Sequence, residues 1–332
     1  MRIFHYISIL LFILVVGIFI YQYSPHYQII KGDIFGTYYS IKIKTDIKNN
    51  EIKNKVKEKL KEINNTMSVF DTESEISKIN QAPAGQQIEL SFSMREVIKA
   101  ADKVYRQTNG YFDPSLGRLI DLWGFGSSSK VTPTAEEIKQ ALKSSGFNKL
   151  KFVNDFQYIT KTNAQTMINL SAIAKGWAVD EIARLLDGEG YKNYIVEIGG
   201  EVKTQGYREH DEPWSIGINK PAANSSDNIL VMSLSNMAVA TSGNYRNFYS
   251  SDGKIIGHTI SFETGEPAET DVASVSVFHD SCMMADAYAT AIVAMGVEKG
   301  LDFANRQKLK VIIFDREFNQ HLSKSARKIF SE

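Results

Sequence analysis

The sequence predicts a single domain of the α+β class, which follows an N-terminal transmembrane helix and extends from about residue 30 to residue 332. Three observations support this prediction. A long apolar run precedes the domain, helical patterns are prominent in its first half, and short apolar runs typical of a sheet follow from Tyr194. Helices and strands mix without the strict alternation of a parallel α/β fold, so one mixed domain is favoured.

The apolar run at the N-terminus is interpreted as a signal anchor. Residues 7–23 carry no charge, which suits a short bilayer-spanning helix and exceeds a typical signal-peptide core. Arg2 precedes the run, and no small-x-small cleavage pattern follows it. The positive-inside rule then places the N-terminus in the cytoplasm and the rest of the chain outside it. We expect residues 1–29 to be an uncleaved, single-pass anchor of the inner membrane with a short link, and residues 30–332 to form a periplasmic domain. A removed signal peptide is the alternative, and a buried core helix is disfavoured because the run has no polar face.

Hydrophobic periodicity predicts the first elements of the domain. Residues 24–33 read as a link, and the apolar–polar alternation at 38–45 predicts a strand. Apolar residues at helical spacing over 52–67, with lysines and glutamates between them, predict an amphipathic helix with a solvated outer face.

Two more helices are predicted from their first residues. Ser93 with Glu96, and Thr134 with Glu137, match the capping box, in which the two side chains bond to each other's backbone N–H groups. We expect each of these helices to stop at the glycine that follows it.

From Tyr194 onward, short apolar runs separated by turn residues predict the strands of a sheet. The expected strands are 194–198, 214–218, 229–234, 237–241, 255–262, 272–278 and, after a helix at 281–296, 311–315.

Composition and missing motifs exclude several classes of function. The 38 Lys and Arg residues balance 38 Asp and Glu residues without a dense basic stripe, so nucleic acid is not an expected partner. Cys282 is the only cysteine, which rules out an intrachain disulfide and a cysteine-based zinc site, and its apolar neighbours favour burial over nucleophilic chemistry. The sequence contains no GxGxxG, P-loop, HExxH or GxSxG motif, so neither a common nucleotide fingerprint nor a hydrolase triad is supported.

The helix SCMMADAYATAIVAMG at 281–296 contains a polar pair in an otherwise apolar pattern. Asp286 and Thr290 are four residues apart and therefore point the same way. Taken alone, they could be a solvated carboxylate and a hydroxyl bonded to its own helix. They could also offer two hard oxygens to a cation such as Mg²⁺, which prefers oxygen ligands.

Eight segments of the chain resemble, in order, the successive motifs of the ApbE family. They are FGT at 35–37, MSVFDTESEISKIN at 67–80, TNGYFDPSLGRLIDLWGFG at 108–126, INLSAIAKGWAVD at 168–180, YIVEIGGEVKTQG at 194–206, AVATSGNYRNFY at 238–249, GHTISFETGEP at 257–267 and SCMMADAYATA at 281–291. The family consists of FAD:protein FMN transferases, and the resemblance extends from about residue 30 to the C-terminus.

The resemblance implies a T-fold-related, ApbE-like architecture and an exported enzyme. Such an enzyme binds FAD as substrate together with Mg²⁺, joins FMN through its phosphate to a Thr or Ser hydroxyl of an acceptor protein, and releases AMP. The expected acceptors are exported, flavin-carrying subunits of respiratory or redox complexes. A Mg²⁺-dependent FAD pyrophosphatase would use the same site with water as the nucleophile. A non-catalytic flavin-binding surface protein is the other alternative, against which the retained Asp286 and Thr290 argue.

The resemblance also implies which residues form the site. Metal oxygens would come from Asp286, Thr290 and the backbone carbonyl of Ala172. The flavin and adenine contacts would fall on Phe35, Phe70, Tyr111, Phe112, Asp113, Asn169, Lys175 and Ile260.

These residue types suit a flavin dinucleotide. Aromatic faces fit flat heterocycles, Asp113 can accept from a ribose or base, and Lys175 can meet a phosphate as a point charge. Core packing is the alternative for Phe70 and Phe112, and a solvated position is the alternative for Lys175.

A base is expected to activate the acceptor hydroxyl, which is a poor nucleophile at neutral pH. His258 is the first candidate and Asp286 the second. The sequence departs from the family pattern at Phe35 (Met in the family), Phe70 (Tyr), Asn169 (Asp) and Ser261–Phe262 (Asp-Pro), and the changes at Phe70 and Asn169 remove a phenol and a carboxylate that could make polar contacts.

Overall fold

A computed structural model of the chain describes residues 26–47, 49–126, 132–219, 228–243, 248–251 and 254–330. The apolar run predicted to be the anchor therefore lies outside the described residues. Among the helices that are described, none combines the length and the apolar character needed to cross a bilayer.

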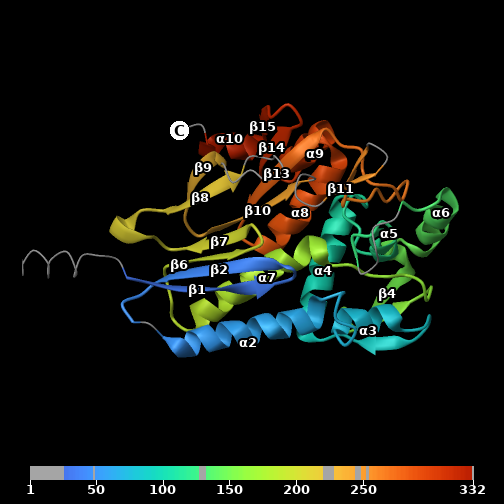
Figure 1. Cartoon of the computed structure of the whole chain (residues 1–332), viewed down its shortest axis with the longest axis horizontal. Coiled ribbons are helices and arrows are strands. Elements are labelled where there is room, and N and C mark those ends of the chain that lie inside the picture. Colours follow the sequence, from blue (N-terminus) through green and yellow to red (C-terminus); the bar gives the residue numbers. More distant parts are fainter. Residues whose placement is uncertain are drawn as a thin grey trace, which may run out of the picture.

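The centre of the described structure is an antiparallel sheet of 8 strands (Figure 1). In spatial order, its strands are β1 (Tyr27–Ile34), β2 (Thr37–Lys44), β6 (Tyr194–Ile198), β7 (Glu201–Gln205), β10 (Met237–Gly243), β13 (Val272–His279), β14 (Lys310–Asp315) and β15 (Gln320–Leu322). Every neighbouring pair in this order runs antiparallel.

The helices and the remaining strands surround this sheet. The helices are α2 (Asn50–Met67), α3 (Glu75–Gln81), α4 (Phe92–Gln107), α5 (Gly117–Leu122), α6 (Ala135–Ser144), α7 (Ser171–Gly188), α8 (Cys282–Met295), α9 (Val297–Arg306) and α10 (Lys324–Phe330), with short 3₁₀ turns η1 (Phe147–Lys149) and η2 (Glu209–Asp211). The smaller strand groups are β3 (Gln87–Glu89), β5 (Tyr158–Lys161) and β4 (Leu150–Val153), the hairpin β8 (Trp214–Asn219) with β9 (Asn228–Leu234), and the hairpin β11 (Phe248–Ser251) with β12 (Lys254–Gly257).

Two apolar cores hold the sheet from opposite faces. On one face, α7 and α8 bury most of their residues and pack against each other and the sheet, with α2 outside α7 (Figure 1). On the other face, the β8–β9 hairpin contributes Trp214 and Ile216 to a smaller cluster with Phe278 and Ile312. A helix that is apolar on nearly every side, as α8 is, is stable only when it is enclosed by its neighbours.

Most of the elements predicted from periodicity are confirmed. The mixed α+β domain, the strand near 38–45 and the amphipathic helix near 52–67 are all present, the last two as β2 and α2. The capping box of Thr134 and Glu137 at the start of α6 is formed as predicted.

The capping box predicted at Ser93 is wrong. The N-cap of α4 lies two residues earlier, at Ser91, whose hydroxyl accepts from the backbone N–H of Met94. Glu96 instead accepts bonds from the indole of Trp177 and the guanidinium of Arg184, so its side chain joins α4 to α7.

Two further predictions are corrected. The link predicted over 24–33 is wrong from Tyr27 onward, since β1 begins there and buries Ile30 and Ile34 against the core. The strand predicted over 255–262 ends with β12 at Gly257, and the chain then turns, with the Ser261 N–H donating to the Glu266 carbonyl at 2.8 Å.

Candidate active site

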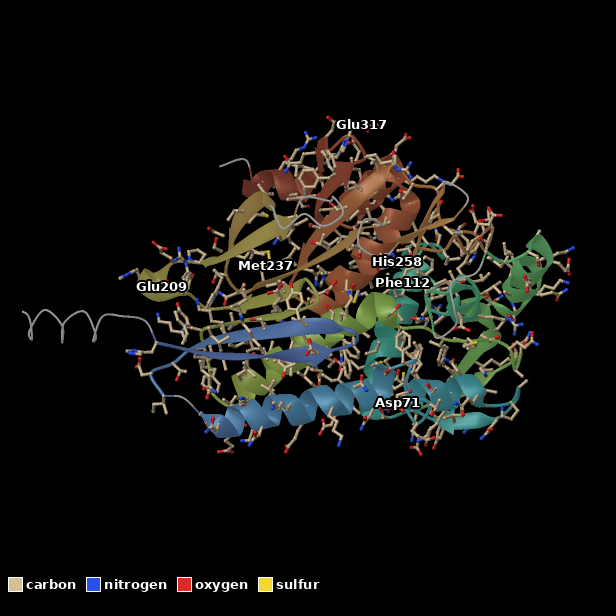
Figure 2. All side chains as sticks on the ribbon, in the orientation of Figure 1. Asp71, Phe112, Glu209, Met237, His258 and Glu317 are labelled. Carbon is tan, nitrogen blue, oxygen red and sulfur yellow. The ribbon has the colours of Figure 1, made fainter. Side chains whose placement is uncertain are left out.

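A cavity of about 510 Å³ collects residues from segments that are distant in the sequence. Every residue predicted for the site lines it: Phe35, Phe70, Tyr111, Phe112, Asp113, Asn169, Ala172, Lys175, His258, Ile260, Asp286 and Thr290. Phe112 and His258 are far apart in the sequence, but both line this cavity, and Figure 2 shows both near the centre of the molecule. The structure thus brings these residues together, while their individual roles stay predictions.

Asp286 is buried on α8 and divides its two carboxylate oxygens between different neighbours. Its side chain is 1% exposed, so the solvated alternative is wrong. Oδ2 accepts the backbone N–H of Gly176 at 3.0 Å, and Oδ1 lies 3.7 Å from the Lys175 ammonium. A buried carboxylate normally needs such partners, because removing its charge from water is costly.

Gly176 allows α7 and α8 to approach closely at this point. A Cβ atom on Gly176 would lie 2.3 Å from the Cys282 carbonyl oxygen and 2.8 Å from Cβ of Asp286. In a regular helix the Gly176 N–H would bond to the carbonyl of Ala172, a turn earlier. Here the same N–H donates to Asp286, so a backbone group of α7 holds a side chain of α8 at this contact.

The oxygens near Asp286 suit a hard divalent cation. The Thr290 hydroxyl lies 3.2 Å from the Ser242 hydroxyl, and Thr290, Asp286 and Ala172 all line the cavity. A carboxylate, a hydroxyl and a backbone carbonyl are the ligand types that Mg²⁺ accepts, with water and phosphate oxygens completing its octahedron. In the part of the chain that the structure describes, no three His, Cys, Asp or Glu side chains cluster as a metal centre.

Lys175 lies between two buried carboxylates. Its ammonium is 2.6 Å from Oε1 of Glu201 and 3.7 Å from Oδ1 of Asp286, while 30% of the side-chain surface stays exposed, so Lys175 is ion-paired at the cavity wall and not freely solvated. Burial alone would lower the pKa of Lys175, but Asp286 and Glu201 raise it above the usual lysine range. The side chain therefore stays charged and can face an anionic substrate from the cavity wall.

Sequence reasoning missed Glu201 and Ser242. Glu201 is 1% exposed at the start of β7 and lines the cavity, and burial raises the pKa of its carboxyl well above the ordinary range while Lys175 opposes this shift. The available signal for Glu201 was its place directly after Gly199 and Gly200. Both glycines adopt positive φ in the turn that leads into β7, a conformation that glycine permits.

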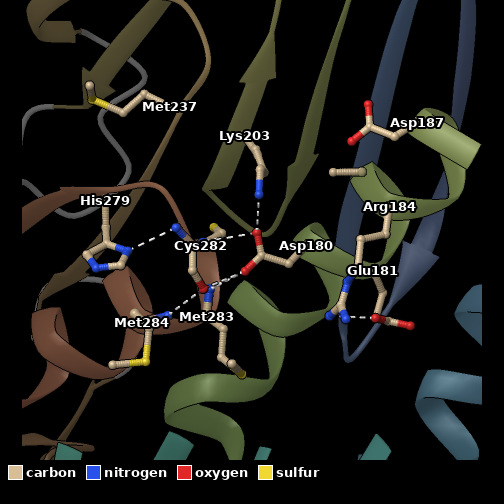
Figure 3. A network of polar contacts seen from close by, with 12 residues as sticks. Asp180, Glu181, Arg184, Asp187, Lys203, Met237, His279, Cys282, Met283 and Met284 are labelled. Atoms are coloured by element: carbon tan, nitrogen blue, oxygen red, sulfur yellow. Dashed lines mark hydrogen bonds and ion pairs between the residues drawn. The ribbon is translucent and has the colours of Figure 1, made fainter. Parts of the chain in front are cut away.

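The first turn of α8 is fixed by Asp180 of α7 (Figure 3). The carboxylate of Asp180 accepts from the Ser281 hydroxyl at 2.7 Å, from the N–H of Met283 at 3.0 Å and from the Lys203 ammonium at 2.7 Å. An acidic side chain at a helix N-terminus satisfies N–H groups that have no partner in the helix. Cys282, next to this cap, is fully buried, and burial raises the pKa of its thiol, which agrees with the predicted structural role.

The predicted flavin and adenine residues differ in how they are exposed. Phe70 is 67% exposed, which excludes core packing for this ring. Phe112 and Ile260 are buried in the core clusters, so their contribution to the cavity is chiefly its shape. The Tyr111 hydroxyl accepts from the Lys299 ammonium at 3.0 Å, which fixes its ring at the cavity wall.

The polar residues Asp113 and Asn169 already have local partners. Oδ1 of Asp113 accepts from the backbone N–H and the hydroxyl of Ser115, and burial raises the pKa of this carboxyl. Asn169 donates its backbone N–H to the Pro114 carbonyl, and its Oδ1 accepts from the Ser171 N–H at the start of α7. Both side chains therefore stabilise the loop walls of the cavity as well as facing it.

His258 follows β12 directly and is half-buried at the cavity. Its ring meets that of Phe125 edge to face, with 6.2 Å between ring centroids. A titratable imidazole at the wall of a cavity that also holds a carboxylate and an ammonium is well placed for proton transfer.

Comparisons with known proteins agree with this geometry. The family model described as ApbE family matches residues 35–313. An FAD:protein FMN transferase of Vibrio cholerae is 33% identical, covering 91% of this chain and 92% of that protein, and one of Haemophilus influenzae is 32% identical, covering 90% and 89%. The solved flavin transferase ApbE from Vibrio cholerae superposes with a TM-score of 0.85 at 32% identity over 92% of this chain and 99% of that one. The apo form of the Pseudomonas stutzeri flavinyl transferase ApbE gives 0.84 at 29% identity over 93% and 98%.

Proposed function

Because this chain belongs to the ApbE family, we propose that it is an FAD:protein FMN transferase. The observation that carries the proposal is the joint placement of Asp286, Thr290 and Lys175 with aromatic side chains in one cavity. Oxygen ligands and an ammonium suit a pyrophosphate, while aromatic faces suit a flavin.

We further propose that the reaction needs Mg²⁺, held by Asp286, Thr290 and the carbonyl of Ala172. The chemistry of these donors supports the assignment, since all three offer oxygen. When bound, the ion would neutralise charge on the pyrophosphate while its P–O bond loosens.

The side chains of the cavity then divide the remaining work. Lys175 holds a phosphate oxygen by charge, and His258 accepts the proton of the acceptor hydroxyl. The hydroxyl oxygen forms a bond to the FMN phosphorus, the bond from this phosphorus to the bridging oxygen breaks, and AMP leaves with the electron pair. His258 is preferred to Asp286 as the base, because Oδ2 of Asp286 accepts the Gly176 N–H and Asp286 is also the proposed carboxylate ligand of the cation.

The acceptor and the location are part of the same proposal. We expect the acceptors to be exported proteins that carry flavin in respiratory or redox complexes. The uncharged run at residues 7–23 supports attachment to the inner membrane with the domain on the periplasmic side, and this run lies outside the described residues.

The test is incubation of the full chain with FAD, Mg²⁺ and a candidate acceptor protein, followed by mass spectrometry of the acceptor. A mass gain equal to FMN supports the transferase. Free FMN and AMP with an unmodified acceptor would indicate the pyrophosphatase, and intact FAD would indicate a binding protein. An acceptor whose Thr or Ser hydroxyl has been removed is the control.

A further inference from the structure

Glu201 is a buried acid in the cavity that the proposed mechanism does not use. Its side chain is 2% exposed, and Oε1 accepts from the Lys175 ammonium at 2.6 Å. Among the described residues, no donor bonds to the second oxygen, Oε2. A buried carboxylate oxygen without a partner is costly, which calls for a functional explanation.

The position of the Lys175 ammonium indicates how Glu201 affects Asp286. The ammonium lies within hydrogen-bond distance of Glu201 but 3.7 Å from Oδ1 of Asp286. With Oδ2 of Asp286 bonded to Gly176, Oδ1 is the oxygen left to meet a cation. An ammonium bonded to Oδ1 would occupy the place of that cation and repel it.

We propose that Glu201 is a positioning residue of the cation site, which draws Lys175 away from Asp286 and so keeps Oδ1 of Asp286 open to a divalent ion. This inference rests on the proposed function, because it deepens the same site. With Glu201 and Asp286 both ionised, the two carboxylates and the one ammonium carry one net negative charge next to the cation. Without the charge of Glu201 the group is neutral, and Asp286 becomes the only carboxylate within reach of the ammonium.

The test uses Mn²⁺ alone as the probe, because bound and free Mn²⁺ are distinguished by electron paramagnetic resonance. Glu201→Gln in the full chain should weaken Mn²⁺ binding by roughly 10- to 100-fold, the usual effect of losing a partner that orients a metal ligand. Glu201→Asp, which keeps the charge, should lose less. Glu197→Gln is the matched control, since Glu197 lies on the adjacent strand β6 and outside the cavity lining.

A second variant separates positioning from direct ligation. If Glu201 acts through Lys175, the double variant Glu201→Gln with Lys175→Met should bind Mn²⁺ more tightly than Glu201→Gln alone, because no ammonium remains to occupy Asp286. Recovery of affinity supports the proposal. An equally weak double variant would assign Glu201 as a ligand and overturn it, as would wild-type affinity in Glu201→Gln.

FMN transfer by the wild-type chain is measured separately, so that a failure of the transferase proposal can be told apart from a failure of the positioning role of Glu201. Absence of transfer together with the expected Mn²⁺ pattern overturns the transferase and leaves the positioning role. Normal transfer with unchanged Mn²⁺ affinity in a folded Glu201→Gln variant, checked by its thermal melting, overturns the positioning role alone.

Discussion

At the scale of single residues, the cavity depends on how a few buried charges share their partners. Asp286 gives one oxygen to a backbone N–H and keeps the other 3.7 Å from Lys175, while Glu201 takes the ammonium. Each group is stable in the interior because another one is present, so a single substitution changes the state of its neighbours. Variants in this cluster are therefore most informative when affinity and rate are measured separately.

His258→Ala tests the base. We expect the rate of FMN transfer to fall by roughly 10²- to 10⁴-fold, the usual contribution of positioned proton transfer. Affinity for Mn²⁺ should stay near the wild-type value, because His258 is not among the proposed cation ligands. His210→Ala, in an exposed 3₁₀ turn, is the control. Full transfer activity in His258→Ala would remove His258 from this role.

At the scale of elements, the contact between α7 and α8 sets the geometry of the site. Asp180 of α7 caps α8. Gly176, one turn earlier on α7, has no side chain and therefore lets α8 approach closely. The two contacts fix both the direction and the distance of α8, so Asp286 and Thr290 are presented to the cavity by rigid helices. Sites built on helices keep their geometry better than sites on loops.

Gly176→Ala should disturb this contact. The added methyl group would overlap the Cys282 carbonyl, and overpacking of this kind typically costs about 1–3 kcal/mol of unfolding free energy. Because Asp286 must move with α8, affinity for Mn²⁺ should fall as well. Urea unfolding and Mn²⁺ titration measure the two effects. Gly188→Ala on the same helix is the control, since nothing lies within 4 Å of its added carbon. Equal behaviour of the two variants would refute this account.

The hairpin of β14 and β15 carries a pH-dependent contact. Asp315 accepts from His321 at 2.8 Å and from the N–H of Asn319, and these bonds lower the pKa of Asp315 to about 2. A carboxyl whose pKa is lower in the folded state stabilises the fold above its unfolded pKa of about 3.9, and this stabilisation is lost as the pH falls through about 2. The difference in unfolding free energy between wild type and Asp315→Asn should therefore shrink from pH 5 to pH 2. A difference that stays constant across this range would contradict the assignment.

Periodicity predicted much of the fold, and every residue predicted for the site lines the cavity, but the contacts made across the cavity were not predicted. The apolar spacing of α2 and the alternation of β2 are local, so the sequence displays them. Glu201 acquires its role only when β7 brings it against Lys175 of α7. The start of α4 was misplaced for the same reason, because Glu96 bonds to α7 and not to its own helix end.

At the scale of the whole molecule, the cavity joins parts of the chain that are far apart in sequence. Phe35 follows β1, Phe70 follows α2, Asn169 precedes α7, and Thr290 belongs to α8. A ligand that touches all of these segments binds only when they are folded together. Binding of FAD should therefore stabilise the described domain as one unit.

This coupling predicts the effect of ligands on unfolding. A ligand held at about 100 times its Kd adds about 2.7 kcal/mol to the unfolding free energy when it binds only the folded state. We expect FAD to raise the unfolding free energy measured by chemical denaturation by this amount, and Mg²⁺ added with FAD to raise it further. Asp286→Asn should keep the FAD increment and lose the Mg²⁺ increment, because its amide carries no charge for the cation. Two separate transitions, of which FAD moves only one, would mean that the cavity is formed by part of the domain and not by the whole.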